Sequence, residues 1–206
     1  SGLCARAGGK RLTGQTQTSD KERETVMDLG ISRNVAPLLE EVRNFIVGEI
    51  YPVEQEFMDE IGVGDRWQLT GRQIEIMAKG LWNFFLTDGE SGSGLTTVEY
   101  AYLAEEMGKS HLAAECFNCA APDTGNMEVL HKYGSEAQKK QWLEPLMKGQ
   151  IRSAYAMTEP GVASSDATNI CTSAVLEGDE WVINGEKHYV SGAGDPRCKI
   201  MIVMVK

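Results

Sequence analysis

The spacing of hydrophobic residues changes near residue 150 of this 206-residue chain. Before that position, apolar side chains recur every three or four residues, which is typical of amphipathic helices. After it, they alternate with polar residues or form short β-branched runs, which is typical of strands. The pattern predicts an α+β fold, in which an all-helical domain over residues 32–150 is followed by the start of a β domain over residues 151–206.

The helical part contains several start and stop signals. Thr96 precedes a periodic apolar run, and Ser135 with Gln138 has the spacing of a capping box. Pro52 marks the end of the first helix, because a proline ring disrupts a helix interior. We expect helices over residues 34 or 37–51, 67–85, 96–107, 112–121, 124 or 126–133, and 135–148.

The β part consists of strand-like runs separated by turn residues. Gly178 and Asp179 lie between two alternating runs and predict a hairpin. The final run, Ile200–Val205, is entirely apolar, and a native domain rarely ends on such a strand unless more chain follows. We expect strands over residues 151–157, 172–177, 180–184, 187–191 and 199–205.

Composition argues against several classes of partner and location. With 20 basic and 30 acidic residues, the chain has a net charge of −10 and no basic stripe, so we expect neither nucleic acid nor an anionic membrane surface as partner. No apolar run approaches the roughly 20 residues that span a bilayer. No segment has the apolar centre of a secretory signal peptide. We expect an intracellular protein, mitochondrial or peroxisomal if eukaryotic and cytoplasmic if bacterial.

Residues 1–31 are expected to be a linker or disordered. The first 19 residues carry basic side chains and several Ser, Thr and Gly, but no acidic residue. This composition is typical of a linker that follows a preceding domain, and a transit peptide is the weaker alternative.

The five cysteines are scattered along the chain, and their odd number favours free thiols over a disulfide framework. Cys116 and Cys119 have the spacing of half a metal site or of a redox pair. No second Cys-x-x-Cys or His pair completes a tetrahedral site. We therefore expect no metal, and we interpret both residues as small apolar side chains in an Ala-rich helix.

The segment from Tyr155 to Asp166 is the main candidate for a binding site. A strand-like run stops at Thr158, and small, hydroxylated and turn-forming residues follow. Such a loop can present hydroxyls and backbone N–H groups to a ligand, although most loops of this composition are simple turns. Further along, Tyr189 and Ser191 lie at i and i+2 of a predicted strand and would share one face. Together the two segments could cradle a flavin, whereas a strand tyrosine alone is more often part of a core.

Both segments resemble signatures of the acyl-CoA dehydrogenase family. The first reads Thr158-Glu159-Pro160, a short loop, and Ser165-Asp166. The second reads Asn184-Gly185-Glu186-Lys187 and then Tyr189-Val190-Ser191, where the family usually has Asn-Gly-x-Lys and Trp-Ile-Thr. Tyrosine thus replaces tryptophan, serine replaces threonine, and the first loop is slightly longer than in the commonest members. Residues 121–128 and 162–169 resemble the branch of members ten and eleven, whose animal proteins carry an additional kinase-like domain.

The resemblance implies a fold, a reaction and a cofactor. Family members have an N-terminal helical domain, a middle β-barrel and a C-terminal helical bundle, so this chain would be a truncated unit that ends after the first strands of the barrel. The reaction would be α,β-dehydrogenation of acyl-CoA thioesters in fatty-acid β-oxidation, with FAD as cofactor. The FAD-binding residues would be Tyr155, Met157, Thr158, Ser164, Ser165, Tyr189, Val190 and Ser191, and Ser165 would also approach the acyl-CoA substrate.

The resemblance places the catalytic base, a glutamate, in the C-terminal bundle. No catalytic residue is therefore expected in this chain, Glu159 is interpreted as structural, and the fragment alone is expected to be inactive. An electron-transferring flavoprotein would reoxidise the flavin, and the complete protein would be a homodimer or homotetramer. An acyl-CoA oxidase, a flavin monooxygenase of the same fold and a non-catalytic truncated isoform remain as alternatives.

Overall fold

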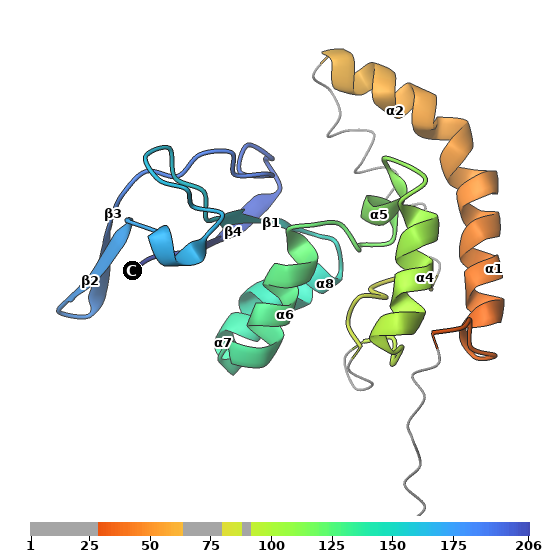
Figure 1. Ribbon diagram of the computed structural model, residues 1–206, viewed down its shortest axis with the longest axis horizontal. Coiled ribbons are helices and arrows are strands. Elements are labelled where there is room, and N and C mark those ends of the chain that lie inside the picture. The colour runs from red at the N-terminus through yellow and green to blue at the C-terminus, as the bar shows by residue number, and fades with distance from the viewer. Residues whose placement is uncertain (1–28, 64–79, 88–91) are drawn as a thin grey trace, which may run out of the picture. The chain divides into compact units, whose positions relative to one another are not determined.

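The structure is a computed structural model, and it describes residues 29–63, 80–87 and 92–206 (Figure 1). Every element described below belongs to one compact unit, which begins at Ile31 and ends at Lys206. Within the described ranges, no helix combines the length and the apolar character that crossing a bilayer requires.

The first helical segment is longer than the sequence predicts. Helix α1 (Val35–Phe45) continues through a π-helical turn (Ile46–Ile50) into α2 (Tyr51–Val63). The expected end near Tyr51 is therefore wrong. Pro52 lies in the first turn of α2, where a missing backbone N–H is tolerated, and the preceding π turn replaces the regular hydrogen-bond ladder.

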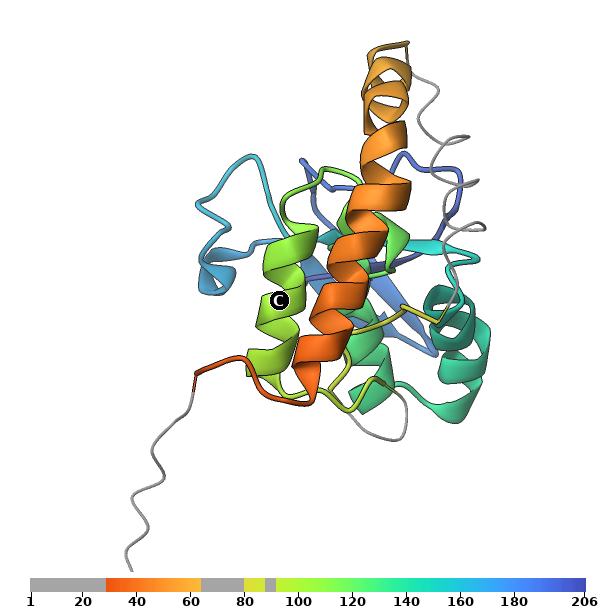
Figure 2. The ribbon, with the colours of Figure 1, turned by 90° about the vertical axis from the view of Figure 1, so that its right-hand side faces the viewer.

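Helix α4 (Thr97–Met107) lies beside α1 (Figures 1 and 2). Its capping box is confirmed, because the Thr96 hydroxyl accepts from the Glu99 N–H and the Glu99 carboxylate accepts from the Thr96 N–H. Between the two helices, Arg43 Nη2 lies 2.7 Å from Glu106 Oε1. Hydrogen bonds from Arg43 and then Lys109 lower the pKa of the buried Glu106 carboxyl.

The next helices lead to the first strand. They are α5 (Ala113–Cys116), α6 (Asp123–Tyr133), and a continuous segment of α7 (Glu136–Gln138), a π turn (Lys139–Leu143) and α8 (Glu144–Met147). The capping box of Ser135 and Gln138 is confirmed. The expected helix over residues 112–121 is reduced to α5, which is a single turn.

The helix expected over residues 67–85 falls largely outside the described ranges, but residues 80–85 are not helical. Asn83 has a φ of 58°, a left-handed conformation that ends any helix and that asparagine tolerates well. The Asn83 side chain stabilises this conformation, because its Nδ2 donates to the Met147 carbonyl and its Oδ1 accepts from Asn118.

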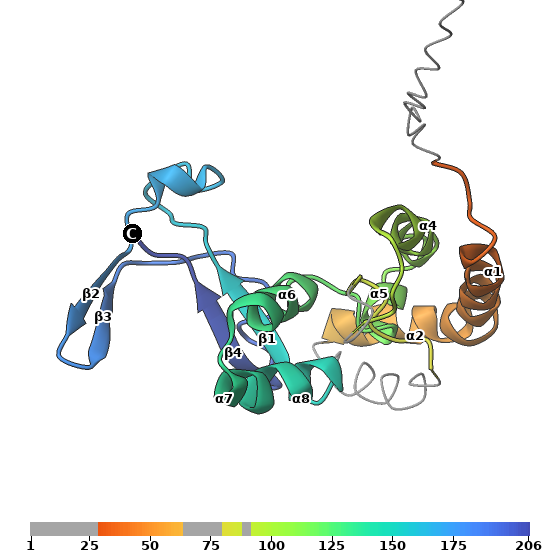
Figure 3. The ribbon, with the colours of Figure 1, turned by 90° about the horizontal axis from the view of Figure 1, so that it is seen from below.

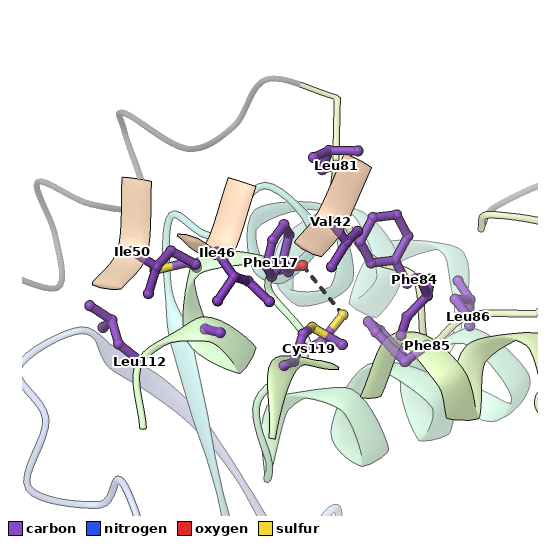
Figure 4. Packing of buried hydrophobic residues seen from close by; sticks show 14 of the residues in the cluster. Val42, Ile46, Ile50, Leu81, Phe84, Phe85, Leu86, Leu112, Phe117 and Cys119 are labelled. Atoms are coloured by element: carbon purple, nitrogen blue, oxygen red, sulfur yellow. Dashed lines mark hydrogen bonds between the residues drawn. The ribbon is translucent and has the colours of Figure 1, made fainter. Parts of the chain in front are cut away.

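A hydrophobic core joins these helices (Figure 4). Phe117 is fully buried at its centre and contacts the rings of Phe45 and Phe84, with ring centroids 5.5 Å and 5.8 Å apart. Val42 and Ile46 come from the first helical segment, and Ile200 of the β part packs against the same cluster. Helical and β regions therefore share packing contacts.

Two pairs of strands follow the helices. Strand β1 (Arg152–Ala156) pairs in parallel with β4 (Cys198–Val203), and α6 lies against β1 (Figure 3). Strands β2 (Ser173–Glu177) and β3 (Glu180–Asn184) form the expected antiparallel hairpin, whose turn has Gly178 at a φ of +65°. A short 3₁₀ helix (Ala167–Asn169) precedes β2. The α+β fold class is confirmed, while the domain boundary at residue 150 stays a prediction.

The strand predicted over residues 187–191 is wrong. Tyr189 has a φ of 53°, so the backbone leaves the extended conformation there, and a turn follows at residues 191–194. Lys187 and His188 instead hydrogen-bond to the segment that follows β1.

Candidate functional site

The carboxyl end of β1 presents Tyr155 at the protein surface. Tyr155 is the one exposed residue of this strand, at 37%. It lines an open, mainly apolar cavity of about 460 Å³ together with residues from the start of α6 and the turn before it: Ala121, Pro122, Thr124, Gly125, Asn126 and Val129. Parallel pairing with β4 along one edge and packing against α6 hold β1 in place, so the cavity has a rigid wall.

Glu159, just beyond β1, ties together three parts of the chain. Its buried carboxylate accepts four hydrogen bonds: from Lys187 Nζ at 2.8 Å, from the backbone N–H groups of Cys171 and Thr172, and from the Thr172 hydroxyl. The loop between Glu159 and Thr172 is thus closed at its two ends by one side chain.

These donors decide the protonation state of Glu159. The Lys187 ammonium, followed by the Thr172 hydroxyl, lowers the pKa of the Glu159 carboxyl to about 2, against the opposing effect of burial. The group is therefore ionised at neutral pH and has little tendency to accept a proton. This geometry agrees with a structural role for Glu159.

The two segments that the sequence singled out meet at the end of β1. The His188 N–H donates to the Thr158 carbonyl at 3.0 Å. The Lys187 ammonium donates to the Met157 carbonyl at 3.0 Å as well as to Glu159. Thus Lys187 of the Asn-Gly-x-Lys pattern connects the second segment to the end of β1, a role that the sequence did not predict.

Tyr189 does not share a strand face with Ser191, because the predicted strand is absent. The Tyr189 side chain is 86% exposed, and its ring contacts that of His188 at a centroid distance of 4.3 Å. Ser191 is the first residue of the following turn, and it is also exposed. Both residues lie in a loop rather than on a strand. Tyr189 follows His188, which hydrogen-bonds to Thr158, whereas Ser191 lies beside the start of β1 and lines a cavity with Arg152 and Ser153.

The hydroxyls near this junction differ in their availability. Ser164 is buried, and its Oγ accepts from the Glu159 N–H at 2.7 Å, so it supports the loop from inside. Among the described residues, the hydroxyls of Thr158, Ser165 and Ser191 have no hydrogen-bond partner. These three hydroxyls could bind a polar ligand, with Thr158 at the junction and Ser191 beside the start of β1.

A second, smaller cavity of about 140 Å³ is lined in part by Ser191. Polar and apolar groups contribute about equally to its lining, which consists of Ser191, Gly192, Arg152 and Ser153 of β1, Asp195, Glu115 and residues 120–122. Sequence reasoning did not predict this cavity. The available signal in the sequence was a charged residue, Arg152, at the start of an otherwise uncharged strand.

Cys116 and Cys119 are buried in the core, as expected for small apolar side chains. Burial raises the pKa of Cys116 to about 12 and that of Cys119 to about 11, so neither is a reactive thiolate. The described residues contain no cluster of His, Cys, Asp and Glu side chains that could hold a metal ion.

Comparison with known proteins identifies two family domains. Residues 35–150 match the acyl-CoA dehydrogenase N-terminal domain, and residues 154–206 match the acyl-CoA dehydrogenase middle domain. Acyl-CoA dehydrogenase family member 10 of Mus musculus is 50% identical over 186 residues, which is 86% of this chain and 17% of that protein. Family member 11 of Homo sapiens is 51% identical over 181 residues, 84% of this chain and 23% of that protein.

Solved structures agree with this assignment. A putative acyl-CoA dehydrogenase from Mycobacterium abscessus has a TM-score of 0.75 and 50% identity, and the match covers 84% of this chain and 46% of that one. An acyl-CoA dehydrogenase from Bacillus anthracis, complexed with FAD, has a TM-score of 0.63 and 28% identity over 85% of this chain and 29% of that one. This chain therefore spans less than half of the length of each of these relatives. With both domains matched in sequence order, the chain belongs to the acyl-CoA dehydrogenase family.

Proposed function

We propose that the complete protein is an FAD-dependent acyl-CoA dehydrogenase, which oxidises the Cα–Cβ bond of an acyl-CoA thioester in fatty-acid β-oxidation. The observation that carries this proposal is the junction at the end of β1. There, the His188–Thr158 and Lys187–Glu159 hydrogen bonds bring both signature segments together. Tyr155, two residues before Met157, lines the apolar cavity.

The residues at the junction and beside the start of β1 fit a flavin. Unpaired hydroxyls at Thr158, Ser165 and Ser191 suit a ligand that has several carbonyl and ring-nitrogen atoms. The Thr158 hydroxyl and the backbone of Tyr155 and Met157 would hold the pyrimidine edge. When bound, FAD supplies the hydride acceptor of the reaction.

The other predicted residues would surround the ring. The exposed Tyr189 ring would pack on the isoalloxazine, Val190 would continue that wall, and Ser191 would approach N5 or O4. Ser165 would stand where the flavin meets the CoA ester. Ser164 would act indirectly, because its hydroxyl supports the backbone of Glu159.

The substrate side of the proposal rests on the larger cavity. Its apolar lining and its volume of about 460 Å³ suit a hydrocarbon chain. The α-proton of a thioester is a weak acid, so its removal requires fixed donors for the developing enolate charge and a closely positioned hydride acceptor. The proposed flavin edge beside the cavity would satisfy the second requirement.

The base that removes this proton is proposed to lie outside this chain. Glu159 is the acidic residue of the signature, but its pKa of about 2 and its four donors make it a weak base. An electron-transferring flavoprotein is the proposed electron acceptor, and a homodimer or homotetramer is the proposed assembly.

The proposal is tested on the purified complete protein. We expect bound flavin in the visible spectrum, and bleaching of that spectrum by acyl-CoA esters under anaerobic conditions. Turnover should require an artificial electron acceptor or an electron-transferring flavoprotein. Turnover with oxygen alone would favour an acyl-CoA oxidase, and oxygen consumption that requires reduced flavin without an acyl-CoA would favour a monooxygenase. A protein without flavin would contradict the proposal and favour a non-catalytic isoform.

A further inference from the structure

Five charged side chains form a cluster around the smaller cavity. They are Glu115 of α5, Asp123 at the start of α6, Arg152 at the start of β1, and Asp195 and Arg197 in the turn before β4. Their side chains are between 2% and 20% exposed. Charges buried to this extent need well-placed partners, so the cluster restrains the elements that carry them.

Arg152 connects the helical elements to the turn. Its Nε lies 2.8 Å from Asp123 Oδ2, and its Nη2 lies 3.5 Å from Glu115 Oε1. Its backbone N–H donates to the Arg197 carbonyl at 2.9 Å. The Arg152 side chain therefore contacts α5 and α6, and it shares the Glu115 carboxylate with Arg197, whereas the backbone hydrogen bond to Arg197 does not depend on the side chain.

The turn is also fixed from within. Arg197 Nη2 lies 2.8 Å from Asp195 Oδ2 and 3.2 Å from Glu115 Oε1. Burial would raise the pKa of Asp195, but the hydrogen bonds from Arg197 and the nearby positive charges of Arg197 and Arg152 lower it, so the carboxylate is ionised. The Asp195 N–H donates to the Gly192 carbonyl at 3.0 Å, which closes the turn next to Ser191.

Gly192, the residue after Ser191, is the part of the turn that contacts β1. Gly192 has a φ of +82°, and a Cβ atom there would lie 3.2 Å from the Ser153 carbonyl oxygen. Ser153 follows Arg152, and Asp123 Oδ1 accepts from its N–H at 2.7 Å and from its hydroxyl. The strand side of this contact is thus held by the same acidic partner that holds Arg152.

Arg152 and Ser191 line the same cavity. Arg152 Nη1 is buried and has no hydrogen-bond partner among the described residues, although its guanidinium lies between two carboxylates. A buried guanidinium donor without a partner lowers stability. We propose that Arg152 is a positioning residue for the flavin site: through Glu115, which it shares with Arg197, its side chain holds the turn at residues 191–195 against β1 and thereby fixes the Ser191 hydroxyl. This inference rests on the proposed FAD site.

The test is a double-mutant cycle on the complete protein, with Arg152→Met, Ser191→Ala and the double variant. The readouts are the FAD dissociation constant and the visible absorption bands of the flavin at saturation.

We expect Arg152→Met to weaken FAD binding by about tenfold, which corresponds to the loss of one well-placed hydrogen bond, and to shift the absorption bands of the bound flavin. In the Ser191→Ala background, the same substitution should add little. A residue that only stabilises the fold would lower the melting temperature without moving the bands of saturated flavin.

Arg43→Met is the matched control, because Arg43 forms an ion pair with Glu106 between α1 and α4. It should lower stability and leave the flavin bands unchanged. If Arg152→Met does not fold, Arg152→Lys is measured in the same cycle and decides the outcome. Wild-type spectra for either Arg152 variant, or additive effects of Arg152 and Ser191, would overturn the inference while the proposed function stands. A wild-type protein that binds no FAD would overturn both.

Discussion

Glu159 shows how the surroundings of a residue decide its chemistry. It lies in a signature motif, it is acidic, and it is close to the proposed flavin, all of which would suit a general base. Its carboxylate is instead surrounded by Lys187, Thr172 and Cys171, which stabilise the charged form. The residue therefore serves to hold Lys187 and the start of β2 against the end of β1.

The pKa of Glu159 leads to a pH-dependent stability. Because the folded-state pKa of about 2 is below the ordinary value of 4.5, Glu159 contributes its full stabilisation above about pH 4.5 and loses it as the pH falls towards 2. We expect the melting temperature of the wild type to fall through this window. Glu159→Gln should melt at a lower temperature at neutral pH and should show a shallower acid decline, as measured by calorimetry.

Glu136→Gln is a suitable control for that experiment. Glu136 is 92% exposed in its side chain and forms a surface ion pair with Lys139, so its removal should change stability little. Parallel pH profiles for the wild type and Glu159→Gln would contradict the role given to this carboxylate.

The proposed flavin contacts can be tested residue by residue. Thr158→Ala should weaken FAD binding by roughly 0.5–1.5 kcal/mol, which is the usual contribution of a neutral hydrogen bond. Tyr189→Ala should weaken it more, because a large ring surface is lost. Titration of the apoprotein with FAD provides the dissociation constants. Tyr133→Ala removes another exposed tyrosine, from the end of α6, and should leave FAD binding unchanged. Equal FAD affinity in all three variants would contradict the site.

At the scale of elements, helix α6 has two glycines in opposite situations. A Cβ at Gly134, which caps the helix, would lie 2.5 Å from the Leu130 carbonyl oxygen, whereas a Cβ at Gly125 would have no atom within 4 Å. Gly134→Ala should therefore destabilise the protein by about 1–3 kcal/mol through overpacking. Gly125→Ala should stabilise it by up to about 1 kcal/mol through helix propensity. Denaturant unfolding measures both, and the same sign for the two substitutions would count against the described packing of α6.

Local sequence signals predicted elements well where interactions between residues close in sequence determine the conformation. The capping boxes at Thr96 and Ser135 and the hairpin turn at Gly178 follow from short-range chemistry, and the structure confirms them. The helix expected to stop at Pro52 continues, because a π turn places the proline in a tolerated position. The strand expected at residues 187–191 is absent, because hydrogen bonds from Lys187 and His188 to distant residues override its β-like pattern.

The candidate site was partly readable from the sequence. The motifs at residues 158–166 and 184–191 identified the segments that meet at the end of β1. The charged cluster could not be predicted in the same way. Glu115 and Arg197 are separated by 82 positions, and only the folded chain brings them to 3.2 Å.

At the scale of the whole molecule, one core links the helices to β4, so opening it requires cooperative unfolding. This yields a prediction for thiol labelling in a Cys4→Ser background. Cys171 is exposed and should react first in the native protein. Cys116 and Cys119, buried and with pKa values raised to about 12 and 11, should react only when the protein unfolds. Mass spectrometry of alkylated peptides would identify the order, and early labelling of Cys116 would show that the core opens locally.

The closure of the loop at residues 160–171 by one carboxylate has a practical consequence for protein engineering. Glu159 lies at one end of the loop, and its carboxylate accepts hydrogen bonds from the backbone of Cys171 and Thr172 at the other end. The distance between the two ends therefore does not depend on the length of the loop. Lengthening a closed loop costs little, about 0.6 kcal/mol for each doubling. Gly161 is exposed, and no atom lies within 4 Å of a Cβ placed there. A short peptide tag inserted after Gly161 should therefore leave the fold intact, which makes this loop a site for attaching a fluorophore.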